Sequence, residues 1–170
     1  MTFDEAFVEE NKLSKINQHV SDNNKYLLEI STYKVGKPED HYWSYTRGQV
    51  YNILTNELLF DIKRNYSSFW YLFVEHPNGN DYLLCGRDYH GGYNIFDLTN
   101  KKEYEYKPDH SGHYMQCFCW VDAFYNEYDK TLSVEGCYWA CPFEKVIFDF
   151  SDPTKVPLTE LSRQDLDNND

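Results

Sequence analysis

Polar and apolar positions repeat three times in the same order along this chain. In each copy, a cluster of turn-forming residues precedes a short apolar strand. The three clusters with their strands cover residues 21–30, 76–85 and 126–134. Asn-Asn and Asn-Gly pairs form tight turns because these residues tolerate a positive φ. We therefore expect a turn followed by a strand at each place.

A second pattern follows each of these strands. Residues 50–56, 93–100 and 146–152 each contain an apolar strand that ends in small polar residues, with Leu-Thr-Asn in the first two and Phe-Ser-Asp in the third. An apolar strand that ends in this way is typical of a hairpin. Further strands are expected at 57–62 and 103–106. Two others, at 69–74 and 118–124, precede the second and third turn clusters.

Together these segments predict an all-β fold with about three four-stranded antiparallel units, because repeats of about 45–55 residues indicate propellers or arrays. The strand rhythm over most of residues 12–158 resembles the blades of WD40-like and kelch-like propellers, although the Gly-His and Trp-Asp motifs of WD40 blades are missing. Propellers close with about four to eight blades. The units would thus form a partial propeller, a twisted β-sandwich, or a ring that a second chain completes. The alternative is an irregular sandwich whose hairpins look alike because they share turn chemistry.

A chain of 170 residues predicts a single domain over residues 1–170. Residues 1–18 are expected to be a lead-in segment, either a short helix or a strand. The polar residues 162–170 are expected to be a flexible acidic tail.

The net charge of −12 excludes some partners and favours others. It repels nucleic-acid phosphate and anionic membrane surfaces, so we expect no direct binding to either. It suits a basic protein partner, or it keeps the protein soluble without any further role. No apolar run reaches the roughly 20 residues needed to span a bilayer, and the acidic N-terminus does not resemble a signal peptide. These features, with an odd number of cysteines, predict a cytoplasmic protein with free thiols.

Two polar and aromatic stretches supply the candidate binding residues. In the hairpin at 136–143 and just after it, Tyr138, Trp139 and Phe143 would anchor a partner and Glu144 would form a charged rim. Tyr138 and Trp139 would otherwise fold back onto the core. The loop at 86–92 adds three polar candidates, Arg87, Asp88 and His90. Other basic residues in the middle of the chain, Arg47, Lys63 and Arg64, are expected to pair with surface carboxylates, as is Arg87.

The cysteines allow a metal site but do not favour one. Cys117 and Cys119 share a strand face, and Cys137 and Cys141 follow one hairpin later, so four thiolates would be available to zinc. Their spacing differs from the Cys-x-x-Cys of zinc knuckles. Cysteine is also a common small core residue. We expect no metal and no cofactor.

The segments 76–86, 118–122, 132–142 and 148–150 resemble a family of uncharacterised bacterial and phage proteins. The resemblance implies a microbial setting and no mechanism.

Three functional hypotheses remain from the sequence. The first is a non-catalytic acidic protein-binding module, such as a phage-borne inhibitor of a host defence enzyme or a bacterial immunity protein. The second is an enzyme or small-ligand-binding protein with a site among loops 86–92, 108–114 and 136–143, where Asp88, His90, His113 and Cys137 would converge. The third is a structural protein that self-associates through its edge strands.

Overall fold

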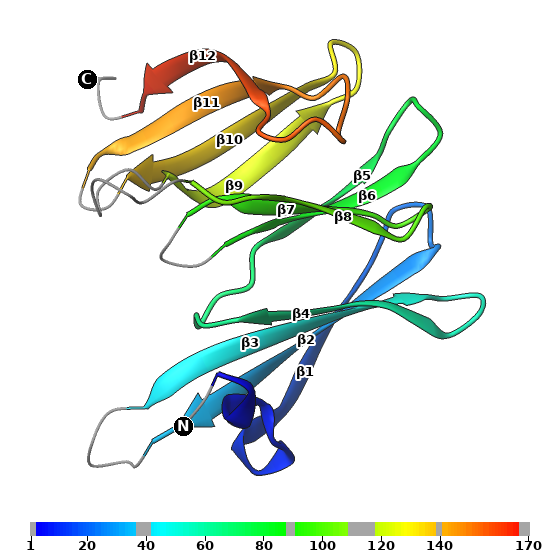
Figure 1. Cartoon of the computed structure of the whole chain (residues 1–170), viewed down its shortest axis with the longest axis vertical. Helices are drawn as coiled ribbons and strands as arrows, with labels where there is room; N and C mark the ends of the chain where they lie inside the picture. Colours follow the sequence, from blue (N-terminus) through cyan, green and yellow to red (C-terminus); the bar gives the residue numbers. More distant parts are fainter. Residues whose placement is uncertain (1–2, 37–41, 88–90, 109–117, 139–140, 167–170) are drawn as a thin grey trace. The chain divides into compact units, whose positions relative to one another are not determined.

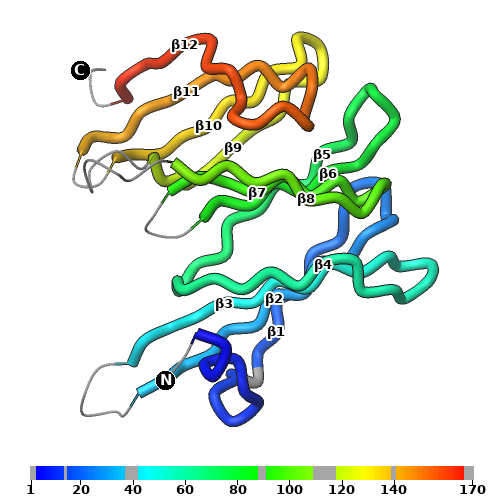
Figure 2. Tube along the Cα trace, viewed as in Figure 1, coloured from blue at the N-terminus to red at the C-terminus, as the bar shows by residue number. Residues whose placement is uncertain are grey.

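The computed structural model describes residues 3–36, 42–87, 91–108, 118–138 and 141–166. These residues contain twelve strands in three four-stranded antiparallel sheets, and within each sheet the strands pair in the order of the chain (Figures 1 and 2). The predicted all-β fold with three four-stranded antiparallel units is confirmed. By contacts the chain divides into two compact units, residues 1–69 and residues 70–170.

The first unit holds one sheet and the second unit holds two. The first sheet consists of β1 (Lys12–Val20), β2 (Tyr26–Val35), β3 (Trp43–Asn52) and β4 (Glu57–Arg64). The second sheet consists of β5 (Tyr71–Glu75), β6 (Asp81–Gly86), β7 (Tyr93–Asp97) and β8 (Lys102–Tyr106). The third sheet consists of β9 (Phe118–Asn126), β10 (Thr131–Tyr138), β11 (Phe143–Asp149) and β12 (Thr159–Asp165).

The three sheets repeat the same register, so the internal likeness extends beyond turn composition. In each sheet, the first or second residue of the second strand lies opposite an Asn or Asp at the end of the third strand. These pairs are Tyr26 with Asn52, Tyr82 with Asp97, and Thr131 with Asp149. The residue after each Asn or Asp donates its backbone N–H to the carbonyl of the residue before its partner, at 2.9 Å in all three copies. The sheets are therefore three copies of one unit.

The turn after the third strand also repeats. The side-chain oxygens of Asn52, Asp97 and Asp149 accept backbone N–H groups from residues two or three positions later, at 3.1, 2.8 and 2.9 Å respectively. Such side-chain bonds stabilise a turn in place of a backbone bond. The predicted Asn-Gly turn before β6 is also present, and Gly79 adopts a φ of +90° there.

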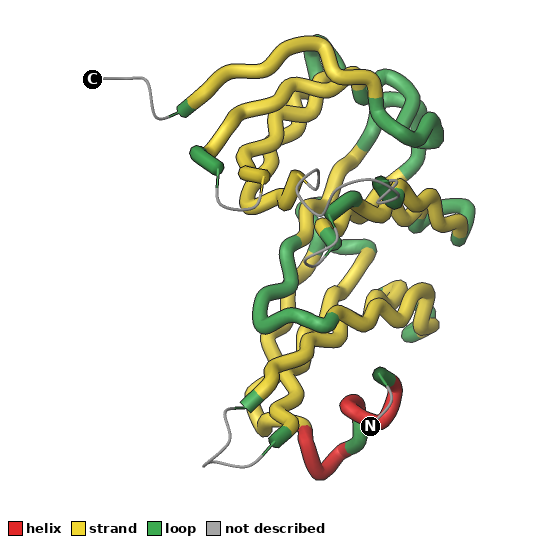
Figure 3. The backbone as a smooth tube through the Cα atoms, turned by 60° about the vertical axis from the view of Figure 1, so that its left-hand side comes forward, coloured by secondary structure: helices red, strands yellow, loops and turns green. Residues whose placement is uncertain are grey.

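In the first unit, two short 3-10 helices precede β1 and cover one end of the sheet. These are η1 (Asp4–Phe7) and η2 (Glu9–Asn11), drawn red in Figure 3. The Phe7 ring packs edge-on against Tyr33 and Tyr45, with centroids 5.1 and 5.8 Å apart. The expected lead-in segment thus combines short helices with the first part of strand β1. On the opposite face, the Phe69 ring lies so close to Gly48 that an added Cβ would approach it to 2.4 Å.

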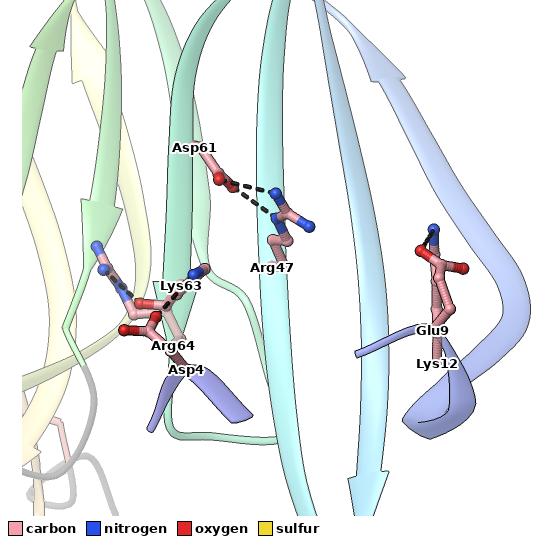
Figure 4. Close-up of polar contacts among 7 residues, drawn as sticks. All are labelled: Asp4, Glu9, Lys12, Arg47, Asp61, Lys63 and Arg64. Carbon is pink, nitrogen blue, oxygen red and sulfur yellow. Dashed lines mark hydrogen bonds and ion pairs between the residues drawn. The ribbon is translucent and has the colours of Figure 1, made fainter. Parts of the chain in front are cut away.

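Ion pairs cross the polar face of this first sheet (Figure 4). Arg47 on β3 binds Asp61 on β4 through two hydrogen bonds, of 2.6 and 2.8 Å, and Lys63 binds Asp4 at 2.8 Å. In the second unit, Arg87 pairs with Glu105. The expected pairing of these basic side chains with carboxylates is confirmed for Arg47, Lys63 and Arg87.

The second unit has one core, to which both of its sheets contribute. Tyr82, Leu84 and Ile95 from the second sheet meet Leu132 and Val134 from the third, and all five are fully buried. Each such apolar side chain contributes roughly 1.5–3 kcal/mol through burial. Buried positions alternate along β10, as expected for a strand with one face on a core, whereas β6 is buried at five consecutive positions, 81–85.

Strand β12 includes residues that the sequence analysis assigned to a tail. Residues 162–165 belong to this strand, whereas 167–170 lie outside the described residues. The described part of the chain contains no helix with the length and apolar character needed to cross a membrane.

Candidate binding site

A cavity of about 190 Å3 lies within the second unit. Six aromatic side chains line it: Tyr93, Tyr106, Phe118, Trp120, Tyr138 and Phe148. Glu160 and Arg163 supply its charged groups, and Gly92, Pro108, Pro157 and Leu158 complete the wall. Binding sites commonly combine hydrophobic and aromatic walls with a few convergent polar groups.

Strand alternation and one glycine bring the aromatic residues of the third sheet together. Phe118 and Trp120 lie two positions apart on β9 and so share one face. Tyr138 lies opposite Phe118, and Gly136 lies opposite Trp120. A Cβ on Gly136 would come within 2.3 Å of the Cys119 carbonyl oxygen and 2.9 Å of the Phe118 ring. Glycine at this position therefore allows Phe118 to lie against β10.

A stack of rings forms the inner wall of the cavity. Trp120 stacks on Tyr93 with centroids 4.7 Å apart, and on Phe148 with centroids 5.9 Å apart. Trp70 packs edge-on against Trp120, with ring centroids 5.4 Å apart. Each such ring pair adds roughly 0.5–1.5 kcal/mol beyond area burial. The wall is therefore built from both sheets of the unit.

Tyr93 also attaches the segment before β12 to this wall. Its hydroxyl oxygen accepts the backbone N–H of Leu158 at 2.6 Å. Burial raises the pKa of Tyr93 to about 12, so its phenol stays protonated at neutral pH. This bond fixes Leu158 at the cavity, directly before β12 begins at Thr159.

Arg163 lies over the aromatic side of the opening. Its guanidinium carbon is 5.4 Å from the ring centroids of both Phe118 and Tyr138, within the range of a cation–π contact. It donates two hydrogen bonds to Glu160, of 2.9 and 2.7 Å, and one to Glu144. The hydrogen bonds to Glu160, and to a lesser extent the one to Glu144, raise the pKa of Arg163. The same bonds from Arg163 lower the pKa of Glu160. The two carboxylates and one guanidinium carry a net charge of −1.

A β-bulge places Glu160 and Arg163 on the same face. Residues three apart on a regular strand point to opposite faces. In β12 the pairing shifts, because Ile147 pairs with Ser162 whereas Phe148 pairs with Glu160. The extra residue reverses the alternation, as bulges do. Both charged side chains therefore reach the cavity.

The structure brings some of the sequence-predicted residues to this cavity and leaves others elsewhere. Tyr138 lines it, and Glu144 binds the arginine at its opening. Phe143 is 43% exposed and lies opposite Cys137, one position from Glu144 and thus on the other face of the sheet. Arg87 pairs with Glu105. Trp139, Asp88 and His90 lie outside the described residues, so their roles stay predictions.

All three loops proposed from the sequence border this one cavity. Loop 86–92 contributes Gly92, loop 108–114 contributes Pro108, and hairpin 136–143 contributes Tyr138. Gly92 has a φ of +84°, and a Cβ there would approach the Tyr106 carbonyl oxygen to 2.2 Å. The sequence analysis also predicted that Asp88, His90, His113 and Cys137 converge, and the structure does not bear on this prediction in the same way. Cys137 is not among the lining residues, and the other three lie outside the described residues.

Two of the candidate zinc-binding cysteines, Cys119 and Cys137, lie on the face of the third sheet opposite the cavity. Cys119 and Cys137 are cross-strand partners, Cys141 is exposed in the hairpin, and Cys117 lies outside the described residues. Burial, and to a lesser extent Cys141, raises the pKa of Cys137, which favours its neutral thiol over the thiolate that zinc requires. Among the residues that the structure describes, no three His, Cys, Asp or Glu side chains are grouped to hold a metal ion.

Sequence reasoning did not select most of the residues that line the cavity. Phe118 and Trp120 were read only as strand residues, although their spacing shows that they share a face. The sequence did not indicate that Glu160 and Arg163 lie together, because regular strand alternation would place them on opposite faces. Their proximity depends on the bulge.

The fold and this site define an all-β protein of three repeated four-stranded units with an aromatic cavity in its C-terminal unit. No known family model matches the chain. The chain is 34% identical over 149 residues to an uncharacterised protein, R762, of Acanthamoeba polyphaga mimivirus. The match covers 88% of this chain and 56% of that protein, so the chain spans just over half the length of this relative.

Proposed function

We propose that this chain is a non-catalytic binding module that engages another protein through the aromatic cavity of its C-terminal unit. The observation that carries this proposal is the position of the cavity, which takes wall residues from all three loop regions. Loops on a rigid β-scaffold are common binding elements, and tyrosine and tryptophan are common anchors of interfaces. A volume of about 190 Å3 suits one side chain of a partner rather than a large ligand.

The charge of the chain supports a basic partner. A net charge of −12 accelerates encounter with a positively charged surface and repels nucleic acid. Glu144 and Glu160 continue this negative character to the opening of the cavity. An inhibitor of a host enzyme, which the sequence analysis considered, is one form of such a module, and the mimiviral relative agrees with a viral setting. A bacterial immunity protein is another form.

A small-molecule ligand is the second candidate, and the same cavity supports it. The two candidates differ in what fills the cavity, a partner side chain or a free compound. They are separated by testing whether the purified chain retains a small molecule, detected by mass spectrometry after denaturation. Self-association through edge strands remains a third proposal, which the solution mass of the chain tests.

Capture from a host lysate tests the main proposal. The tagged wild-type chain should retain a partner whose binding weakens as salt increases. Tyr138→Ala, which removes one cavity ring, should lose that partner. Tyr128→Ala is the matched control. This substitution removes the same atoms as Tyr138→Ala, but Tyr128 is fully exposed in the turn between β9 and β10. Both variants must show a cooperative melt close to that of the wild type. Equal capture by Tyr138→Ala, or no salt-sensitive partner, contradicts the proposal.

A further inference from the structure

Arg163 places a cation of the chain itself against the rings and carboxylates of the cavity. Its guanidinium faces two aromatic rings, Phe118 and Tyr138, and meets two carboxylates, Glu144 and Glu160. Rings and carboxylates in this arrangement form an aromatic cage with an acidic rim. Cages of this kind recognise cations, because the ring faces carry negative potential.

We propose that this cage binds a guanidinium or alkylammonium side chain of the partner, and that Arg163 occupies the position in the free protein as an internal substitute. This inference rests on the proposed binding function and adds the chemical class of the ligand. Binding is an exchange of one cation for another. The partner's cation takes the place over Phe118 and Tyr138 and pairs with the carboxylates, while Arg163 turns into solvent.

The exposure of the ion pairs makes such an exchange feasible. The Arg163 side chain is 30% exposed, that of Glu160 is 41% exposed and that of Glu144 is 17% exposed, so the pair with Glu160 is the more exposed of the two. Exposed ion pairs are weak, with a typical worth of about 0–1 kcal/mol. Arg163 also lies on β12, a strand at the edge of the sheet whose described side chains are all exposed. No buried element therefore has to move when Arg163 leaves the cage.

The same groups disfavour an anion. Three hydrogen bonds of Arg163 already go to Glu160 and Glu144, and a carboxylate or phosphate would meet both of these negative groups. With Arg163 turned away, the two carboxylates leave a charge of −2 at the opening. A cation is the ligand that neutralises this charge.

Free agmatine and its uncharged comparison compound test the inference without any partner. Agmatine carries a guanidinium at one end of an alkyl chain and an ammonium at the other, whereas butylurea replaces the guanidinium with a neutral urea of similar shape and has no ammonium. Arg163→Ala removes the internal cation. Agmatine should therefore bind this variant about tenfold or more tightly than it binds the wild type, which must first release Arg163. Saturable changes in tryptophan fluorescence report binding, because Trp120 lines the cavity. Arg47→Ala, which removes an ion-paired arginine from the first unit, should show no such gain.

Two results would overturn the inference. One is the absence of saturable agmatine binding to Arg163→Ala, and the other is equal binding of butylurea, which would indicate a site for flat neutral groups. If Arg163→Ala does not melt cooperatively, Arg163→Gln replaces it, and the same two results apply. If partner capture depends on Tyr138 but agmatine does not bind, the proposed function stands and only the proposal of a cationic ligand is rejected. If agmatine binds but no partner is captured, the cation site stands and the proposed protein-binding function is rejected.

Discussion

The Nε2 atom of His76 and the carbonyl oxygen of Phe150 lie 3.0 Å apart, although 74 positions separate the two residues. The other ring nitrogen, Nδ1, accepts the backbone N–H of Asn78 at 3.2 Å, so Nε2 carries the proton and donates it to Phe150. His76 is 6% exposed and lies in the turn between β5 and β6, and Phe150 directly follows β11. This bond joins the second sheet to the third.

Replacement of His76 by Phe should reduce the free energy of unfolding. The ring volume stays, but the buried carbonyl of Phe150 and the backbone N–H of the exposed Asn78 both lose their partner. The unsatisfied buried carbonyl costs about 1–3 kcal/mol, whereas water can replace the partner of the Asn78 N–H. Tyr128→Phe, at a fully exposed position in the turn between β9 and β10, should change stability by no more than about 0.5 kcal/mol. Urea denaturation measures both, and equal effects of the two substitutions would contradict the role of His76.

Tyr93→Phe should destabilise the chain at neutral pH and less so at alkaline pH. At pH 8 the variant loses the acceptor for the Leu158 N–H, at a cost of about 1–3 kcal/mol. The wild-type phenol has a raised pKa of about 12, so its contribution is complete below pH 10 and is lost as pH rises toward 12. The difference in unfolding free energy between wild type and Tyr93→Phe should therefore shrink by about 1 kcal/mol between pH 8 and pH 11. A constant difference would argue against this.

Tyr125→Phe should be neutral or stabilising. The Tyr125 hydroxyl is buried and has no hydrogen-bond partner among the described residues, and burial raises its pKa. Removing an unsatisfied hydroxyl relieves a desolvation cost. Tyr82→Phe is the matched comparison in the same core, because its hydroxyl accepts a hydrogen bond from Asn78 at 2.9 Å. We expect Tyr82→Phe to lower the melting temperature and Tyr125→Phe to leave it equal or higher.

Gly136→Ala should disturb the cavity wall. The added methyl group would meet the Cys119 carbonyl and the Phe118 ring, and overpacking of this kind costs about 1–3 kcal/mol. Gly86→Ala is the control, since its Cβ would meet its nearest neighbour, Trp70, at an ordinary 3.4 Å. Thermal unfolding and the near-ultraviolet dichroism of the aromatic residues should change for Gly136→Ala alone. If both variants behave alike, Gly136 does not determine the position of Phe118.

Asp61→Asn should have a small effect that depends on salt. The bidentate pair of Arg47 with Asp61 is partly exposed, so we expect a loss of about 0.2–1 kcal/mol at low ionic strength and less at 1 M salt. Asp22→Asn removes an exposed carboxylate in a turn of the same unit and serves as the control. Denaturant midpoints at two salt concentrations measure the difference. A loss that persists unchanged in 1 M salt would show that the pair acts by packing rather than by charge.

Local pattern determined the class of fold and the number of repeated units. The Asn-rich turns and the short apolar strands can be predicted from local sequence, because turn residues and strand alternation depend on a few neighbouring positions. The hairpins of 21–56, 76–106 and 126–152 therefore could be read directly. Strand β12 could not, because Thr159–Asp165 is polar and exposed, and its strand form comes from pairing with β11.

Only the tertiary structure assembled the cavity. The sequence indicated that loops 86–92, 108–114 and 136–143 were candidates and selected Tyr138 and Glu144, but it could not show that their flanks meet. Phe118, Phe148 and Arg163 come from three strands, and Tyr93 comes from a different sheet. Their proximity depends on strand register, on a bulge in β12 and on the packing of two sheets. These are long-range relations among residues far apart in the chain, and no local pattern encodes them.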